Sequence, residues 1–200
     1  MQTAQPAPPP ASAPPPERHG RWLPLLSLLG VMAFVTLGGF LFSGSPAGTA
    51  FAGDVEVGSA VEVAHGVTIQ PAAGWQVAGP VASPQGVVLE GGNGRLLVGV
   101  PGGIGSPEEL VAYYASNFLE PQASQLSVGE VEPLSLPAGP AAVARYVGLF
   151  EGVATPIEGE VVGIVSPSGT AVVLDAWASQ GNYGPVHDQV AAMAASVAIP

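Results

Sequence analysis

The sequence predicts an α+β fold, an antiparallel sheet packed with two helices, preceded by one transmembrane helix. Three observations support this prediction: an uncharged apolar run near the N-terminus, short β-type runs separated by Gly/Pro-rich turns, and two segments with helical apolar periodicity. Composition divides the 200 residues into a tail (1–21), an apolar run (22–42), a linker (43–54) and a globular domain (55–200). The last part is long enough to bury its own core.

The tail is rich in proline, with seven prolines in residues 1–16. Proline fixes φ and removes a backbone donor, so the tail is predicted to be disordered with polyproline II character. Two interpretations remain open: a solvated spacer, which the composition favours, and a docking peptide for a cytoplasmic partner.

The apolar run Trp22–Phe42 contains 21 residues without a charge. As a helix it would be roughly 31 Å long, which matches the hydrocarbon core of a bilayer. Arg18 and Arg21 precede it, whereas Asp54 and Glu56 follow it. The positive-inside rule therefore predicts a single-pass protein of the cell membrane, with a cytoplasmic N-terminus and an extracytoplasmic C-terminal domain.

A cleaved signal peptide is the competing interpretation of the same run. Ala50-Phe51-Ala52 forms an A-x-A pattern, and cleavage after Ala52 would release a soluble domain. The apolar run is longer than a usual signal-peptide core, and the pattern lies ten residues past its end. We therefore expect an uncleaved anchor.

The charge balance excludes several functions. Residues 43–200 contain 14 acidic residues against two arginines, a net charge of −12, and lysine is absent. Such a surface repels phosphates, so no nucleic-acid partner is expected. Cysteine is also absent, which excludes disulfides, thiolate catalysis and Cys-ligated zinc.

Two segments are predicted to be helical, 106–118 and 184–197. The first begins with Ser106 as N-cap, Pro107 at the first helical position and Glu109 completing a capping box. The apolar stripes are Leu110, Val111, Tyr114 and Phe118 in the first helix and Val186, Val190, Met193 and Val197 in the second. Each stripe repeats with helical spacing and predicts one buried face.

The remaining apolar runs are predicted to be strands. They span 66–70, 75–78, 86–90, 95–100, 126–132, 140–150, 157–165 and 170–178. Short turns join three pairs of them: PAAG after residue 70, GGNG after residue 90, and PSG between the last two. Strands joined by short turns, with two helices inserted, are typical of an α+β fold.

The segment GVTIQPAAGWQV resembles the opening hairpin of the PsbP-like superfamily, in which an apolar strand leads to P-x-x-G-W and a second strand. The order of elements is similar over about residues 60–199. The superfamily includes photosystem accessory proteins, a eukaryotic Ran-binding import factor and LpqN-type lipoproteins of high-GC bacteria. The resemblance implies a binding or accessory module without a shared active site, so it carries over no functional residues.

No catalytic residue and no cofactor is predicted. The domain lacks G-x-S-x-G, and its only histidines, His65 and His187, lie in a turn and on the polar side of a predicted helix. The loop 101–106 precedes a helix, as in phosphate sites, but no cation lies near it. Glu108 and Glu109 already place negative charge on that helix end.

Paired glutamates are the one pattern that suggests a metal. Glu130 and Glu132 alternate on one predicted strand, as do Glu158 and Glu160 on another. They would form a calcium-attracting patch only if the two strands were neighbours. Solvated strand faces are the favoured interpretation, and no metal site is predicted.

Arg145 and Asp175 are the candidate binding residues, because each lies among apolar neighbours and an unpaired buried charge is unfavourable. Our hypothesis is an ion pair that links two strands. In the functional version of this hypothesis, Arg145, Asp175 and Trp177 form the polar base of a ligand cleft.

The function predicted from the sequence is a non-catalytic, membrane-anchored binding or accessory module of the bacterial cell envelope. Its partner would be an envelope protein, a lipid or a cell-wall component. Two alternatives stay open: a membrane-anchored hydrolase with an unrecognised site, and a subunit of a transport or signalling complex.

Overall fold

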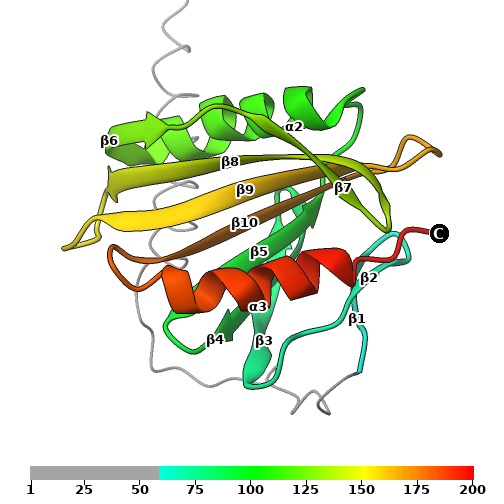
Figure 1. Cartoon of the computed structure of the whole chain (residues 1–200), viewed down its shortest axis with the longest axis horizontal. Coiled ribbons are helices and arrows are strands. Elements are labelled where there is room, and N and C mark those ends of the chain that lie inside the picture. Colours follow the sequence, from blue (N-terminus) through cyan, green and yellow to red (C-terminus); the bar gives the residue numbers. More distant parts are fainter. Residues whose placement is uncertain (1–58) are drawn as a thin grey trace, which may run out of the picture. The chain divides into compact units, whose positions relative to one another are not determined.

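Residues 59–200 are described in the computed structural model of the chain (Figure 1). The strands are β1 (Val61–Ala64), β2 (Val67–Ile69), β3 (Trp75–Ala82), β4 (Gln85–Gly91), β5 (Gly94–Val100), β6 (Ala123–Val128), β7 (Glu132–Leu136), β8 (Gly139–Phe150), β9 (Ile157–Val165) and β10 (Ala171–Ser179). The helices are α2 (Pro107–Tyr114), a π-helical turn (Ala115–Leu119), a 3₁₀ turn (Glu120–Gln122) and α3 (Gly184–Ala195).

The predicted tail, transmembrane helix and linker lie outside these residues. Within the described part of the chain, no helix is long and apolar enough to cross a membrane.

The main sheet is antiparallel, with strand order β3-β4-β5-β10-β9-β8-β6. At its β8 end, two strands share the edge: β6 pairs with the second half of β8, and β7 pairs with the first half. The segment 129–131 separates them, so the edge is one strand interrupted in the middle. The hairpin β1–β2 forms a separate two-stranded sheet.

The two helices cover opposite faces of the sheet, as Figure 1 shows. Val162 and Ile164 of β9 belong to the main core, together with Val190 and Met193 of α3. Gly163 lies between them and faces the other way, because a Cβ placed on it would meet Pro107 and Leu110 of α2. Because side chains alternate along a strand, neighbouring residues point to opposite faces of the sheet. We call the face covered by α2 the α2 face and the face covered by α3 the α3 face.

Helix α2 forms as its sequence predicts. The Ser106 hydroxyl oxygen accepts a hydrogen bond from the Glu109 N–H at 3.1 Å, which confirms the N-cap. Leu110 and Tyr114 are buried on the sheet. The end of the stripe differs from the prediction: the π turn inserts extra backbone, so Leu119 is buried and Phe118 is only half-buried.

Helix α3 also confirms its predicted stripe. Its residues Val186, Val190 and Met193, with Val197 just beyond the helix, are all buried. This apolar face packs on the central strands and on the β1–β2 hairpin in one core. The chain end is tied to that hairpin, since Thr68 and Ala198 exchange both backbone hydrogen bonds.

The hairpin predicted around PAAG is wrong. β2 pairs with β1, a strand that the sequence analysis missed, and β3 pairs with β4. The reversal between β1 and β2 occurs at His65 and Gly66, which both adopt positive φ, at 52° and 78°. PAAG instead carries the chain from the small sheet to the large one.

The other two predicted turns are confirmed. Gly91 pairs with Gly94 across a two-residue turn, in which Gly92 has φ of 58°. The β9–β10 turn is closed by Ser166, whose hydroxyl oxygen accepts a hydrogen bond from the Thr170 N–H at 3.1 Å. The antiparallel sheet with two covering helices is therefore as the sequence predicts.

Candidate functional site

Asp175 lies in the middle of β10, on the α2 face of the sheet. Its cross-strand neighbours are Leu97 on β5 and Val161 on β9, and only 5% of its surface is exposed. The Tyr146 hydroxyl donates to one carboxylate oxygen at 2.7 Å, and the Tyr114 hydroxyl donates to the other at 3.0 Å. This carboxylate therefore ties α2 and β8 to the centre of the sheet.

Burial changes the acid–base behaviour of this cluster. It raises the pKa of Asp175 to about 6, against the opposing effect of the two phenol hydrogen bonds. Burial, and then the Asp175 charge, raise the pKa values of Tyr114 and Tyr146 well above the usual range. Both phenols thus remain hydrogen-bond donors at physiological pH, and Asp175 ionises at a higher pH than a solvated aspartate.

Arg145 lies on the α3 face. It is directly opposite Glu160 on β9, and its Nε atom is 4.0 Å from a Glu160 carboxylate oxygen. Its side chain is 76% exposed. The charged fork of the guanidinium therefore extends into solvent above the sheet.

The predicted ion pair between Arg145 and Asp175 is wrong. In the ladder, Asp175 is paired with Val161, whereas Arg145 is paired with Glu160, the adjacent residue of β9. Adjacent residues of a strand point to opposite faces, so the two charges lie on opposite sides of the sheet. Each charge has other partners: two phenols for Asp175 and Glu160 for Arg145.

Trp177, the third residue of the predicted cleft, shares the α2 face with Asp175. It is two residues further along β10, is buried, and pairs with Gly159 on β9 and Arg95 on β5. The structure therefore brings Asp175 and Trp177 to one face and places Arg145 on the other.

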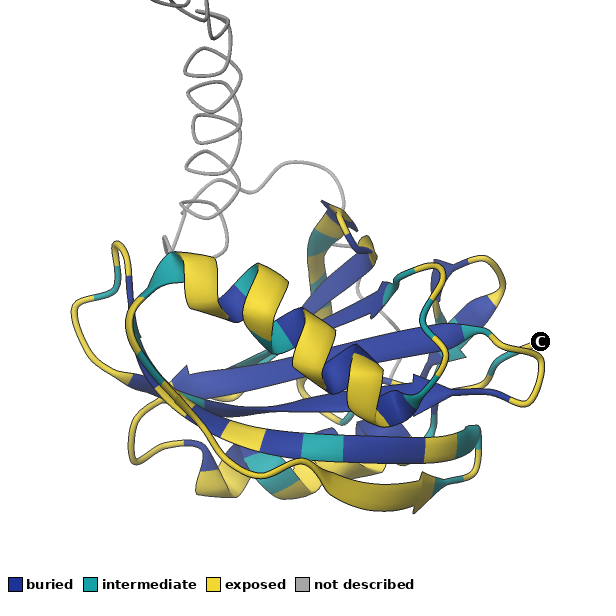
Figure 2. Cartoon of the chain, turned by 90° about the horizontal axis from the view of Figure 1, so that it is seen from above, coloured by how far each residue is buried: buried dark blue, intermediate teal, exposed yellow. Residues whose placement is uncertain are grey.

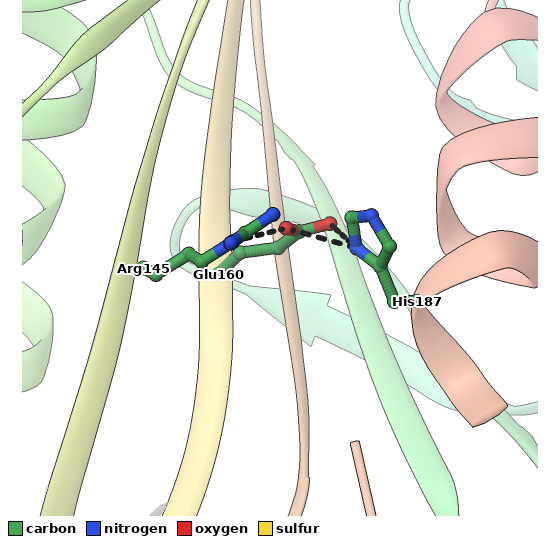
Figure 3. A network of polar contacts seen from close by, with 3 residues as sticks. All are labelled: Arg145, Glu160 and His187. Atoms are coloured by element: carbon green, nitrogen blue, oxygen red, sulfur yellow. Dashed lines mark hydrogen bonds and ion pairs between the residues drawn. The ribbon is translucent and has the colours of Figure 1, made fainter. Parts of the chain in front are cut away.

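Glu160 is the centre of a second polar cluster, which the sequence analysis assigned to a solvated face. Only 3% of its surface is exposed. His187 Nδ1 lies 3.2 Å from its carboxylate, so β8, β9 and α3 each contribute one side chain that points toward a common spot (Figure 3). The Tyr183 hydroxyl is also buried and lies close to the Glu160 carboxylate. Burial, and then the Glu160 charge, raise the pKa of this phenol well above its usual range.

Glu158, on the same strand face, acts at the start of α3. Its carboxylate accepts hydrogen bonds from the Gly181 N–H at 2.8 Å and the Tyr183 N–H at 2.9 Å. A negative charge there compensates the free donors and the dipole of the helix N-terminus. β9 thus uses two carboxylates to dock α3 on the sheet.

The exposed apolar side chains are concentrated elsewhere. Among the described residues, the exposed large hydrophobic side chains are Tyr113, Val128, Val131, Leu134 and Val147. All but Tyr113 lie on β6, on β7, between these strands, or on β8. Figure 2 shows this edge mostly in the colour of exposed residues. Val128 pairs with Tyr146 and therefore points to the α2 face. Leu134 and Val147 lie on the α3 face, since they pair with Ala141 and Glu158. We call Val131, Leu134 and Val147, together with the charged Glu132 and Arg145, the β6–β8 edge patch.

The paired glutamates and His65 do not form a site in the structure of residues 59–200. β8 lies between β9 and the edge that carries Glu130 and Glu132, so the two glutamate pairs are not on neighbouring strands. Within residues 59–200 no three His, Asp or Glu side chains are grouped as a metal site. His65 occupies the exposed turn between β1 and β2.

Neither a known protein family nor a curated protein matches the sequence. Among solved structures, the fold is similar to the solution structure of the cyanobacterial PsbP protein CyanoP from Synechocystis, with a TM-score of 0.52 and 14% sequence identity. The similarity covers 78% of this chain and 100% of that chain. The chain has a PsbP-like fold. The narrower likeness to LpqN-type proteins stays a prediction, and an identity this low transfers no site.

Proposed function

We propose that the protein is a non-catalytic binding or accessory module of the bacterial cell envelope, held at the membrane by residues 22–42. The observation that carries this proposal is the β6–β8 edge patch, where three of the five exposed large apolar side chains of residues 59–200 lie beside two exposed charges. Exposed apolar side chains with a polar rim are typical of protein interaction sites.

The buried acids support binding over hydrolysis. A hydrolase needs a nucleophile and a base that reach the substrate together. Asp175 is enclosed beneath α2 and engaged by two phenols, and Glu160 is enclosed beneath α3. Both groups are used to connect elements of the fold, which leaves the edge patch as the surface that faces a partner.

Site-specific photo-cross-linking in native membranes tests the contact surface. Benzoylphenylalanine replaces Leu134 in the edge patch or, as matched control, Tyr113 on α2, an exposed apolar residue outside the patch. We expect a discrete adduct from position 134 and none from position 113. Adducts from neither position, or equally from both, would remove the support for this contact surface.

The membrane anchor has its own test. The mass and the N-terminal sequence of the mature protein are measured in the membrane fraction and in the medium. An anchored module is expected in the membrane with the tail attached. A form that begins at Gly53 in the medium would show that the signal peptide is cleaved, and the tethered role would be abandoned.

A further inference from the structure

We propose that the occupant of the β6–β8 edge patch is a second copy of this chain, related by a two-fold axis. The inference rests on the proposed function, because it takes the patch to be a contact surface and names what binds there. It depends on the arrangement of two opposite charges within the patch.

Arg145 and Glu132 are diagonal neighbours on one face of the sheet. Glu132 on β7 is directly opposite Val143 on β8, and Arg145 is two residues further along β8. Diagonal neighbours of this kind are about 7–8 Å apart. Both side chains are exposed, and Glu132 forms no ion pair within the described part of the chain.

A two-fold contact places a patch against itself, so its charges must be self-complementary. A patch with charges of one sign would repel its own copy. Here a rotation about an axis between the two residues brings Arg145 to the partner's Glu132, and Glu132 to the partner's Arg145. Glu132 then gains an ion-pair partner, the exposed end of Arg145 gains one besides Glu160, and electrostatic complementarity fixes the orientation.

The apolar members of the patch flank these charges and would be buried in the same contact. Leu134 and Val147 lie on the same sheet face as Arg145, because they pair with Ala141 and with Glu158 respectively. The outer side of β6 and β7 has no further strand within residues 59–200. Pro133 removes one backbone donor from this edge, which favours contact through side chains over a continuous ladder.

Other protein partners fit this charge arrangement less well. Residues 59–200 carry 12 acidic residues and two arginines, which by itself favours a basic partner. A basic surface laid on the patch would meet Arg145, the cation at its centre. An acidic surface would meet Glu132 and the neighbouring Glu130. A second copy satisfies both signs at once.

The absence of cysteine from the chain allows a clean test by disulfide cross-linking. Val131 directly precedes Glu132, and the nearby Gly129 N–H donates to the Arg145 carbonyl oxygen at 2.8 Å, so position 131 lies near the proposed axis. The full-length Val131→Cys variant is oxidised in native membranes. We expect a disulfide-linked dimer, and no dimer from the control Tyr113→Cys on α2.

Charge reversal decides whether the charges pair between copies. Added to Val131→Cys, Glu132→Arg or Arg145→Glu is expected to lower the dimer yield at least fivefold, because each patch then carries two like charges. Co-expression of the two reversed chains restores the yield, since one presents two positive charges and the other two negative charges. Glu132→Arg leaves the contact between Arg145 and Glu160 in place, and its unchanged melting temperature excludes misfolding.

The outcomes separate this inference from the proposed function. A cross-link from position 131 to a different protein overturns the two-fold contact and keeps the patch as a binding surface. A dimer that is insensitive to both reversals, or that forms equally from position 113, also overturns it. No adduct of any kind from the patch overturns both proposals.

Discussion

The centre of the sheet and its β8 edge use polar residues in opposite ways. At the centre, Asp175 and Glu160 are nearly inaccessible, at 5% and 3% exposure, and each binds groups from neighbouring elements. At the edge, Arg145 and Glu132 extend into solvent beside uncovered apolar side chains. The buried charges of the centre thus connect elements of the fold, whereas Glu132 at the edge is exposed and forms no ion pair within residues 59–200, and Arg145 reaches from Glu160 into solvent.

The two central carboxylates also differ from each other. Asp175 is held by neutral phenols, whereas Glu160 faces an arginine and a histidine. Burial raises the pKa of Asp175 to about 6, because the two phenol hydrogen bonds offset only part of the cost of desolvating the charge. Stability should therefore respond to pH through Asp175.

The largest expected effect is this pH dependence. The pKa of Asp175 in the folded state, about 6, lies above the ordinary value of 3.8, so folding favours the protonated form. The resulting stability is present below pH 4 and is lost as the pH rises through 6, by roughly 3 kcal/mol. Chemical denaturation of the full chain between pH 4 and 8 measures it.

The variant Asp175→Asn cannot ionise, so it isolates the contribution of Asp175 to the pH dependence of stability. The free energy of unfolding of this variant should lack the decrease between pH 4 and 7. Asp188→Asn, at an exposed aspartate of α3, should keep the wild-type profile. Parallel profiles for wild type and Asp175→Asn would show that Asp175 is not the group responsible.

The next largest effect on stability is expected from the loss of one phenol hydroxyl. Tyr146→Phe removes a buried hydrogen bond to a charged acceptor and should lower the free energy of unfolding by about 1.5–3 kcal/mol at pH 7.5. The loss should shrink below pH 5, where Asp175 is neutral. The matched control Tyr113→Phe, at an exposed tyrosine, should change stability by less than about 0.5 kcal/mol.

A smaller effect is expected at the start of α2, the helix that covers Asp175. Ser106→Ala removes the N-cap and should cost about 1 kcal/mol, seen as a lower melting temperature and faster amide exchange in the first turn. Ser127→Ala on the exposed face of β6 serves as control. Equal exchange rates in the two variants would mean that the cap contributes little.

Much of the fold could be predicted because its signals are local. The Ser106 cap, the stripes of both helices and the GGNG turn depend on residues close in sequence, and the structure confirms each of them. The predicted buried face of α2 is wrong only at Phe118, where a π turn shifts the backbone by one residue. The spacing of apolar residues in the sequence does not indicate such a turn.

The candidate site could not be predicted to the same extent, because it depends on how strands align. Alternation shows which residues of one strand share a face, but not which face of the sheet they occupy. The alternation therefore allows Arg145 and Asp175 to meet, whereas the register places them on opposite sides. One signal was available: Tyr114, in a predicted buried stripe, needs a hydrogen-bond acceptor, and Asp175 supplies it.

The most direct test of the account compares one change at the edge with one at the centre. Leu134→Ser and Tyr146→Phe are each made in the full chain, and melting temperature and photo-cross-linking from the edge patch are both measured. The cross-linking position is 147, which shares the α3 face with Leu134. We predict that Leu134→Ser abolishes the cross-link and leaves melting unchanged, whereas Tyr146→Phe lowers the melting temperature and keeps the cross-link. The opposite pattern, with the cross-link insensitive to Leu134→Ser, would contradict the assignment of contact to the edge.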